Sequence, residues 1–558
     1  MSMTVSVVES SRPDQLVDAA AELGGKISAL DVVLATQRRA VAHLREFWRG
    51  QAADATGWRV ADDGTVTAPP VPAVLAVLAP AWTAILRKLL ALFAGIDAET
   101  AAAVTAVMEG PVPESPPGTL GDPRRPPPPD APAEDVKQWW DSLSEEERRR
   151  LIADHPPELG NLNGIPAEVR HQVNEAVLRD DLDRVRDAAE HHGVTPDEVL
   201  ADPGAYGLTA ADATRYRNAV QTQKGLDAMG GTDTGETRPV MLWAYDPLAF
   251  NGQGRAAVAI GNPDEAENTA VVVPGTGSSV AQGWLEGDNA TNLYDQMRLG
   301  EPGKPASVIA WMGYDAPDSP LDPRIATPWL ARDGGELLAA DVNGLGVTHE
   351  GGDRTVTVIG HSYGSTTVAD AFAGSGMQAD NAVLIGSPGT DLARSAADFN
   401  LPEGGQVYVG AASSDPVTWL GQGGAVPDIL NHVLDHPLGS RAGLGTDPAG
   451  DGYGSVRFDA EVPGRSGPSF GHHSAYYDVG SESLRAMTDI ANGNGATLAE
   501  NGYTAEGRRQ VHIGLPDTVN LPFIGEVDLP DWDTRIPGTP AVNDPEGDRD
   551  HVTQNHQY

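Results

Sequence analysis

A short motif in this sequence combines a nucleophile with the tight turn that would expose it. Residues 355–359 alternate in the manner of a β-strand, the pattern Gly360-x-Ser362-x-Gly364 follows, and a helical stretch of small residues comes next. A serine that must stand free at the top of a sheet needs strained backbone angles, and the adjoining turns then leave room only for glycine at both ends of the pattern. The motif therefore predicts Ser362 as a catalytic nucleophile. The alternative is an ordinary strand-to-helix turn in which Ser362 caps the helix.

A nucleophilic serine needs a base to take its proton, and the base needs an acid to orient it. In a parallel sheet such groups stand at the carboxyl ends of strands. Asp415 follows the apolar run 406–410, and we predict it as the acid. Asp391, after the preceding predicted strand, is the second candidate. A turn aspartate that accepts local N–H groups would give the same pattern.

The predicted base lies on the loop after the last predicted strand, where two histidines are adjacent in the segment 470–478. Neighbouring side chains usually diverge, so one of the two is expected to serve. We take His473 as the base and keep His472 as the alternative. Three other histidines lie before the last strand or well beyond it and are expected to be structural or exposed: His432, His436 and His512.

The oxyanion that forms during acyl transfer needs two preorganised N–H donors. We predict the amide of Tyr363, directly after the nucleophile, and the amide of Thr276, in the loop Pro274-Gly-Thr-Gly277 after the third predicted strand. Glycine at 275 and at 277 lets the backbone turn its amides inward. A phosphate-binding loop is the competing interpretation, but a third glycine at the right spacing and a following lysine are both missing.

The elements around these motifs predict the α/β-hydrolase fold, a mainly parallel eight-stranded sheet flanked by helices and preceded by an all-helical N-terminal domain. Helix-length segments separate most of the apolar runs, which is typical of βαβ crossovers, and the first two runs favour an antiparallel pair. The nucleophile follows the fifth run. The predicted strands are 240–244, 256–260, 269–273, 307–311, 355–359, 382–385, 406–410 and 456–460.

Composition shifts divide the chain into regions. A short hairpin is expected at 58–66 within the N-terminal helices, and a helix at 135–153 carries a capping box formed by Ser144 and Glu147. The last residues, rich in proline, glycine and aspartate, indicate a wrapping or disordered tail. In order, the predicted regions are a helical domain at 1–110, a proline-rich linker at 111–134, a helical lead-in or possible cap at 135–235, the catalytic domain at 236–495 and the tail at 496–558.

Composition also excludes classes of partner and site. The 558 residues include 79 acids and 38 bases, a formal charge of −41, so nucleic acid and anionic membranes are not expected as partners. Cysteine is absent, which removes thiol catalysis and cysteine metal sites. We expect no cofactor and no metal. We also expect no membrane span, because the most apolar window, 71–86, falls short of the ~20 residues needed to cross a bilayer. The first residues lack a secretory signal, which leaves the cytoplasm or export without a cleaved signal.

These motifs together resemble an actinobacterial α/β-hydrolase family of unknown function. The matching phrases are Pro274-Gly-Thr-Gly277, Gly-His-Ser-Tyr-Gly and His473-Ser-Ala-Tyr476, and residues 139–166 are similar to the family's helical lead-in. The resemblance covers about residues 135–495 and implies an esterase- or lipase-like serine hydrolase without a cofactor. It names no substrate.

The N-terminal helices, with Trp48-Arg-Gly50 at a helix end, are similar to the W-x-G helical-hairpin proteins of type VII secretion. This resemblance implies export or a helical partner bound through residues 1–110.

The leading hypothesis from the sequence is a carboxylic-ester hydrolase that acts on a small-molecule or lipid ester through an acyl-enzyme. Two alternatives stay open. One is an exported interaction protein with a vestigial hydrolase domain, and the other is an acyltransferase that passes the acyl group to an acceptor other than water.

Overall fold

The computed structural model describes residues 125–231, 237–319, 322–326, 328–352, 354–422, 445–462, 468–509 and 544–548, and the backbone of six further short strands. The chain forms two compact units, residues 1–125 with 430–437 and residues 126–429 with 438–558. In the first unit β1 (Arg59–Val60) pairs antiparallel with β2 (Val66–Thr67), which confirms the predicted hairpin. The helices and the W-x-G tripeptide predicted for 1–110 lie outside the described residues.

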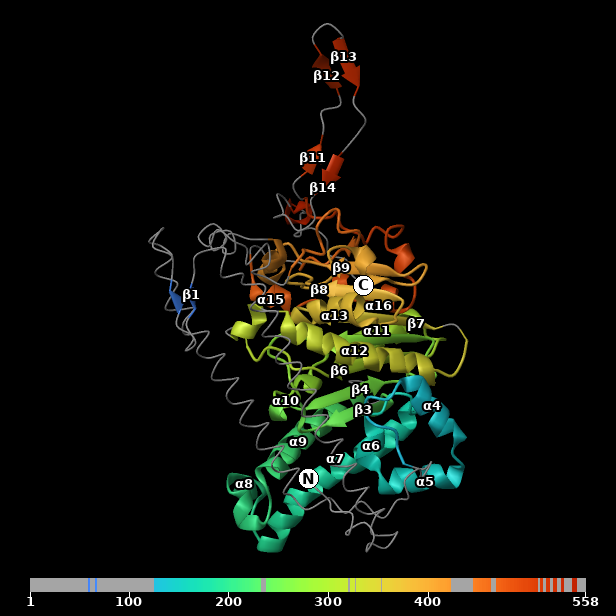
Figure 1. Ribbon diagram of the computed structural model, residues 1–558, viewed down its shortest axis with the longest axis vertical. Coiled ribbons are helices and arrows are strands. Elements are labelled where there is room, and N and C mark those ends of the chain that lie inside the picture. The colour runs from blue at the N-terminus through green and yellow to red at the C-terminus, as the bar shows by residue number, and fades with distance from the viewer. Residues whose placement is uncertain are drawn as a thin grey trace, which may run out of the picture. The chain divides into compact units, whose positions relative to one another are not determined.

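An eight-stranded sheet forms the centre of the second unit (Figure 1). Its spatial order is β10-β9-β8-β7-β5-β6-β4-β3, in which β4 pairs antiparallel with β3 and β6 and the other pairs are parallel. This is the order of the α/β-hydrolase fold, and it confirms that prediction. The strands are β3 (Val240–Asp246), β4 (Arg255–Ile260), β5 (Asn268–Val273), β6 (Ala306–Met312), β7 (Thr355–His361), β8 (Asn381–Ile385), β9 (Gln406–Gly410) and β10 (Val456–Phe458).

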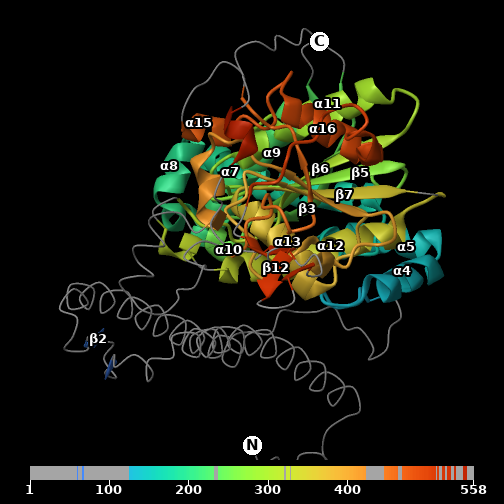
Figure 2. The same cartoon turned by 90° about the horizontal axis from the view of Figure 1, so that it is seen from above.

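Helices cover both faces of the sheet (Figure 2). On one face lie α11 (Asn289–Gly300) and α16 (Glu482–Ala491), and on the other lie α12 (Trp329–Thr348) and α13 (Tyr363–Ser375). Every residue of β5, β6 and β8 is buried, which explains why these strands read as continuous apolar runs in the sequence. The nucleophile motif thus sits at the carboxyl end of a central strand, between two buried neighbours.

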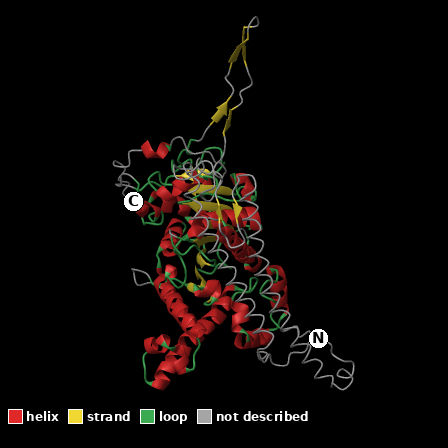
Figure 3. Ribbon diagram, turned by 60° about the vertical axis from the view of Figure 1, so that its left-hand side comes forward, coloured by secondary structure: helices red, strands yellow, loops and turns green. Residues whose placement is uncertain are grey.

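The lead-in is almost entirely helical (Figure 3). The structure divides the helix predicted at 135–153 into two, because the capping box of Ser144 and Glu147 starts a new helix. Residues 156–160, between this pair of helices and the long helix that follows, also form a short helix. The helices are α4 (Ala133–Ser142), α5 (Glu145–Asp154), α6 (Pro156–Gly160), α7 (Ala167–His192), α8 (Pro196–Ala201) and α9 (Ala210–Gly230).

The lead-in is joined to the sheet through its edge strand β3. Asn161 Nδ2 donates to the Tyr245 carbonyl at 2.7 Å, and the Tyr245 N–H donates to Asn161 Oδ1 at 3.0 Å. The Asn161 side chain therefore acts as a substitute for a neighbouring strand. Asn163 Nδ2 donates to Asp341 Oδ1 of α12 at 3.0 Å. The Asn161-Leu-Asn163 stretch is thus a docking element, while the idea of a cap over the pocket stays a prediction.

The described parts of the C-terminal region pack on the unit that holds the eight-stranded sheet, and they also form hairpin strands. β11 (His512–Gly514) pairs antiparallel with β14 (Asp533–Arg535), and β12 (Thr518–Leu521) with β13 (Gly525–Asp528). Asp544 then contacts the buried Arg508. Among the described residues, helices with the length and apolarity needed to cross a bilayer are absent.

Candidate active site

Ser362 stands in the strained turn between β7 and α13. Its φ of 56° and ψ of −131° lie in a region that residues other than glycine rarely adopt. A Cβ at Gly360 would lie 2.5 Å from the Gly364 carbonyl oxygen, and one at Gly364 would lie 2.3 Å from the Pro274 oxygen. Only hydrogen fits at either position. The steric argument that singled out the motif therefore holds in the structure.

The loop after β5 lies directly against this turn. A Cβ at Gly275 would be 2.6 Å from Ser362 Cβ and 2.9 Å from the Tyr363 nitrogen. The Tyr314 hydroxyl donates to the Pro274 carbonyl at 2.7 Å and so fixes the start of the loop. Two residues after Pro274, Thr276 keeps its hydroxyl buried without a hydrogen-bond partner in the described part of the chain. The loop thus packs at Gly275 against the serine and the Tyr363 nitrogen.

A buried carboxylate faces His473. Asp415 Oδ2 lies 2.8 Å from His473 Nδ1, and the Tyr476 hydroxyl donates to the same oxygen at 2.8 Å. The Val417 N–H donates to Oδ1 at 2.9 Å. Burial alone would raise the pKa of Asp415, but the bond with His473 and the other two donors lower it below its ordinary value. The carboxylate is therefore ionised at neutral pH, and it orients the imidazole.

His361, the residue before Ser362, connects the turn to the imidazole of His473. Its ring centroid is 4.6 Å from that of His473, and its Nε2 lies 2.7 Å from the His473 carbonyl oxygen. A carbonyl only accepts, so Nε2 carries the proton. Burial, followed by the charge of His473, lowers the pKa of His361 to about 3. His361 is therefore neutral and holds the backbone of its neighbour.

Ser362 and His473 border the same short segment after β8. The Ser362 N–H donates to the Ile385 carbonyl at 2.9 Å, and a Cβ on the next residue, Gly386, would lie 2.9 Å from His473 Nδ1. A hydrogen bond from the Ser362 hydroxyl to this imidazole is not formed among the described contacts. Such bonds are often long before substrate binds and tighten in the reacting complex.

The second-choice residues contact other groups. His472 is buried, and its Nδ1 hydrogen-bonds the Ser414 hydroxyl. Asp391 forms an ion pair with Arg332 at 2.7 Å. Asp391 therefore contacts another group than His473, while His472 contacts Ser414, the residue before Asp415. The side chains of the other three candidate histidines lie outside the described residues.

Sequence reasoning gave no role to Tyr476, which bonds the same carboxylate oxygen as His473. The signal was available, because Tyr476 lies three residues after His473 in a phrase that already carried the family resemblance. In the described residues, groups of three or more histidine, aspartate or glutamate side chains placed to hold a metal ion are absent.

The family comparison covers the middle of the chain. Residues 249–423 match the model of a family described as alpha/beta hydrolase. An uncharacterized protein of Mycobacterium tuberculosis is 54% identical over 415 residues, which are 73% of this chain and 62% of that protein. An uncharacterized protein of Mycobacterium bovis is 34% identical over 181 residues, 31% of this chain and 66% of that one. The chain thus spans about three fifths of the first relative's length (62%).

Solved structures that align with part of this chain include esterases. An esterase of Pyrobaculum calidifontis aligns with 54% of this chain and 97% of its own, at 14% identity and a TM-score of 0.26. The carboxylesterase EstE1, cloned from a metagenomic library, aligns with 51% and 99% at 14% identity and a TM-score of 0.27.

Proposed function

We propose that this chain is a serine hydrolase that cleaves carboxylic esters, of a small molecule or a lipid, through an acyl-enzyme. The observation that carries the proposal is the Asp415–His473 pair, 2.8 Å apart, beside a serine in a strained turn. Structural turns rarely retain such strain, whereas sites that must present a nucleophile do. The family match over residues 249–423 supports the same class of reaction.

In the proposed reaction Ser362 Oγ attacks the ester carbonyl carbon, and its proton passes to Nε2 of His473. Nδ1 of that ring is engaged by Asp415, so Nε2 is the nitrogen left for the reaction. The ester C–O bond breaks, the imidazolium gives its proton to the departing alcohol, and an acyl group stays on Ser362. Water then repeats the sequence and releases the acid. Asp415 stays ionised and stabilises the imidazolium at both stages.

The oxyanion of each tetrahedral intermediate is assigned to the amides of Thr276 and Tyr363. Support comes from Gly275, whose missing side chain allows the loop to reach the Tyr363 nitrogen. Removing one such donor typically slows turnover by about 10²- to 10³-fold, or ~2.7–4 kcal/mol of barrier. The amides cost no reorganisation during the reaction because the strand, the loop and α13 already hold them.

Ser362→Ala tests the proposal. It should abolish hydrolysis of short p-nitrophenyl esters and covalent labelling by a fluorophosphonate, and peptide mapping of the labelled wild type should identify Ser362. Ser375→Ala is the matched control, because this serine lies at the other end of the same helix α13. Labelling of the mutant equal to that of the wild type would refute the nucleophile assignment. An unlabelled wild type would favour a vestigial site.

Labelling does not separate water from another acyl acceptor. Mass spectrometry of the products in the presence of added alcohols would do so, because a transferase yields a new ester where a hydrolase yields the free acid.

A further inference from the structure

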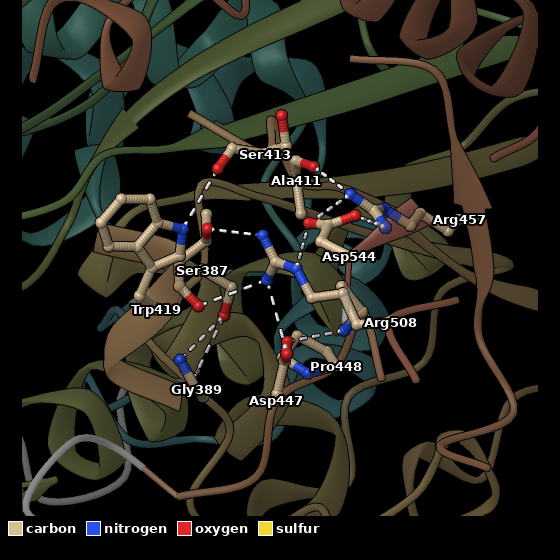
Figure 4. Close-up of polar contacts among 12 residues, drawn as sticks. Ser387, Gly389, Ala411, Ser413, Trp419, Asp447, Pro448, Arg457, Arg508 and Asp544 are labelled. Atoms are coloured by element: carbon tan, nitrogen blue, oxygen red, sulfur yellow. Dashed lines mark hydrogen bonds and ion pairs between the residues drawn. The ribbon is translucent and has the colours of Figure 1, made fainter. Parts of the chain in front are cut away.

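A buried arginine of the C-terminal region, Arg508, lies beside the loop 411–418, which carries Asp415 (Figure 4). Arg508 is fully buried, and its Nη2 donates to the Thr418 hydroxyl at 2.7 Å. The Thr418 hydroxyl in turn donates to the Asp415 carbonyl at 2.8 Å. One side chain therefore separates the Arg508 guanidinium from the backbone of the candidate acid.

A second arginine holds the other end of the same loop. Arg457 Nη2 donates to the Ala411 carbonyl at 2.7 Å. The next residue, Ala412, donates its N–H to the Tyr476 hydroxyl at 3.1 Å, and that hydroxyl donates to Asp415 Oδ2. Arg457 thus fixes the loop just where Tyr476 reaches across it to the carboxylate.

One carboxylate binds both arginines. Asp544 Oδ1 and Oδ2 lie 2.8 Å and 3.1 Å from Arg457, and Oδ2 accepts from Arg508 Nε at 2.7 Å. Asp447 makes a longer contact with Arg508, 3.4 Å from Nη1. Asp544 comes 36 positions after Arg508, beyond the strands β11 to β14. A distant part of the chain therefore completes the support of the loop 411–418.

We propose that Asp544 is a positioning residue for the acid of the triad, acting through Arg457 and Arg508 on both ends of the loop 411–418. The inference rests on the function proposed above and extends it to the C-terminal segment. Without Asp544, the carboxylate of Asp447 would still contact Arg508 but not Arg457, so losing Asp544 should release at least Arg457 from the loop. Asp415 would then lose its alignment with the imidazole.

If Asp544 had a purely structural role, its loss would lower the amount of folded protein but leave turnover per active site unchanged. The test therefore measures both the number of active sites and the turnover of each. Asp544→Asn removes the charge and keeps the shape, and Asp544→Glu restores the charge. Glu403→Gln is the matched control, because it removes one acidic charge from an exposed loop before β9. For each variant, fluorophosphonate titration counts the active sites. Turnover of a p-nitrophenyl ester is then measured per active site over about pH 5 to 9, the range that brackets an imidazole base.

Asp544→Asn should lower kcat per active site by roughly ten- to a hundredfold with little change in KM, because a shift of about 1 Å in a catalytic group can have that effect. The acidic limb of the kcat/KM profile should also move to lower pH. Asp415 and His361 contact His473, and Tyr476 contacts Asp415; of these groups the carboxylate stabilises the imidazolium. Asp544→Glu should recover part of both changes, and Glu403→Gln should match the wild type.

Thr418→Val decides the question if Asp544→Asn does not fold. It removes the hydroxyl that joins Arg508 to the Asp415 carbonyl and leaves Asp544 in place, whereas Thr418→Ser keeps both bonds. We expect Thr418→Val to change kcat and the acidic limb in the same direction, and Thr418→Ser to resemble the wild type. Wild-type turnover per active site and an unmoved acidic limb in Thr418→Val, and in any folded Asp544→Asn, would overturn the inference.

Ser362→Ala is run alongside so that the two proposals can fail separately. If that variant is inactive and unlabelled while Asp544→Asn and Thr418→Val behave as wild type, only the positioning role is wrong. If Ser362→Ala keeps its activity, the triad itself is wrong, and the inference falls with it.

Discussion

Two clusters near opposite ends of the sheet each contain two arginines around a central aspartate, and the second also includes Asp447. Near β4 and β6, Asp341 Oδ2 accepts from Arg255 at 2.6 Å and from Trp311 Nε1 at 2.7 Å. Arg170, stacked 3.9 Å over a tryptophan ring, reaches the same cluster through Asn163. At the other end of the sheet, Asp544 holds its two arginines beside the loop of the candidate acid.

The difference lies in what the arginines touch. In the first cluster Arg170 comes from the lead-in helix α7 and Arg255 from β4, so the cluster joins two structural layers. In the second, both guanidinium groups donate to the loop 411–418. The same chemical device thus stabilises a domain junction in one place and supports a candidate catalytic group in the other. What each cluster does therefore depends on which part of the backbone its arginines bind.

Replacing the central acid of each cluster by alanine should give the largest change in the free energy of unfolding, and the size of the change should distinguish the two clusters. Asp341 is 2% exposed, and removing one partner of a fully buried ion pair destabilises by about 3–5 kcal/mol. The Asp544 side chain is 19% exposed, so Asp544→Ala should cost less, about 1.5–3 kcal/mol. Urea unfolding at neutral pH measures both free energies.

Turnover per titrated active site should behave in the opposite way in these two variants. It should stay at the wild-type level in folded Asp341→Ala and fall in Asp544→Ala. Equal losses of turnover in both would show that the two clusters do not differ in function, and the comparison would break.

Asn161→Ala tests the junction between the lead-in and the sheet and should lower the free energy of unfolding by a smaller amount. The substitution leaves the N–H and the carbonyl of Tyr245 on edge strand β3 without their partner, which typically destabilises by about 1–3 kcal/mol. Asn161→Asp keeps the acceptor and loses the donor, so its loss should be intermediate. Unfolding followed by tryptophan fluorescence would measure it, and a loss below about 0.5 kcal/mol would contradict the docking role.

The sequence predicted the local patterns well. All eight strands lie within two residues of their predicted ends, because a buried strand must be a run of apolar residues bounded by turns. Ser362 could be proposed because a tight strand-to-helix turn imposes glycine at two fixed positions, and the structure has that turn. His473 and Asp415 could be placed after particular strands, and the structure puts these two side chains in contact.

The supporting groups could not be predicted, because their contacts join distant segments without a local pattern. Arg457 and Asp544 are 87 positions apart, and Asn163 and Asp341 are 178 apart. A lone arginine or aspartate in a polar stretch has the same local sequence whether it is solvated or buried. The capping box at Ser144 was recognised, but a continuous helix was still expected across it, because charged residues on both sides favour helix equally.

Asp370 offers the smallest and most selective test, because it is a buried acid without the arginine pairing of the other two. Its Oδ1 accepts the Leu392 N–H at 3.1 Å, while Oδ2 is buried without a hydrogen-bond partner among the described residues. Burial, and then the charge of Asp391, raise the pKa of Asp370 well above its ordinary value. In Asp341 and Asp544 the arginines outweigh burial and lower the pKa.

The signs of the pH effects follow from these directions. An acid whose pKa is raised by folding stabilises fully below its unfolded pKa of about 3.9, and this contribution is lost as pH rises through the folded value. For Asp341 and Asp544 the contribution is present above about pH 3.9 and is lost as pH falls. Asp370→Asn, which keeps the shape and cannot ionise, should therefore gain stability relative to the wild type as the pH rises from about 5 to 8, by at most about 1.4 kcal/mol for each pH unit. Urea unfolding at the two pH values measures the difference, with the exposed Glu403→Gln as control. A difference from wild type that does not change between the two pH values would show that Asp370 is ionised and paired like the other two acids.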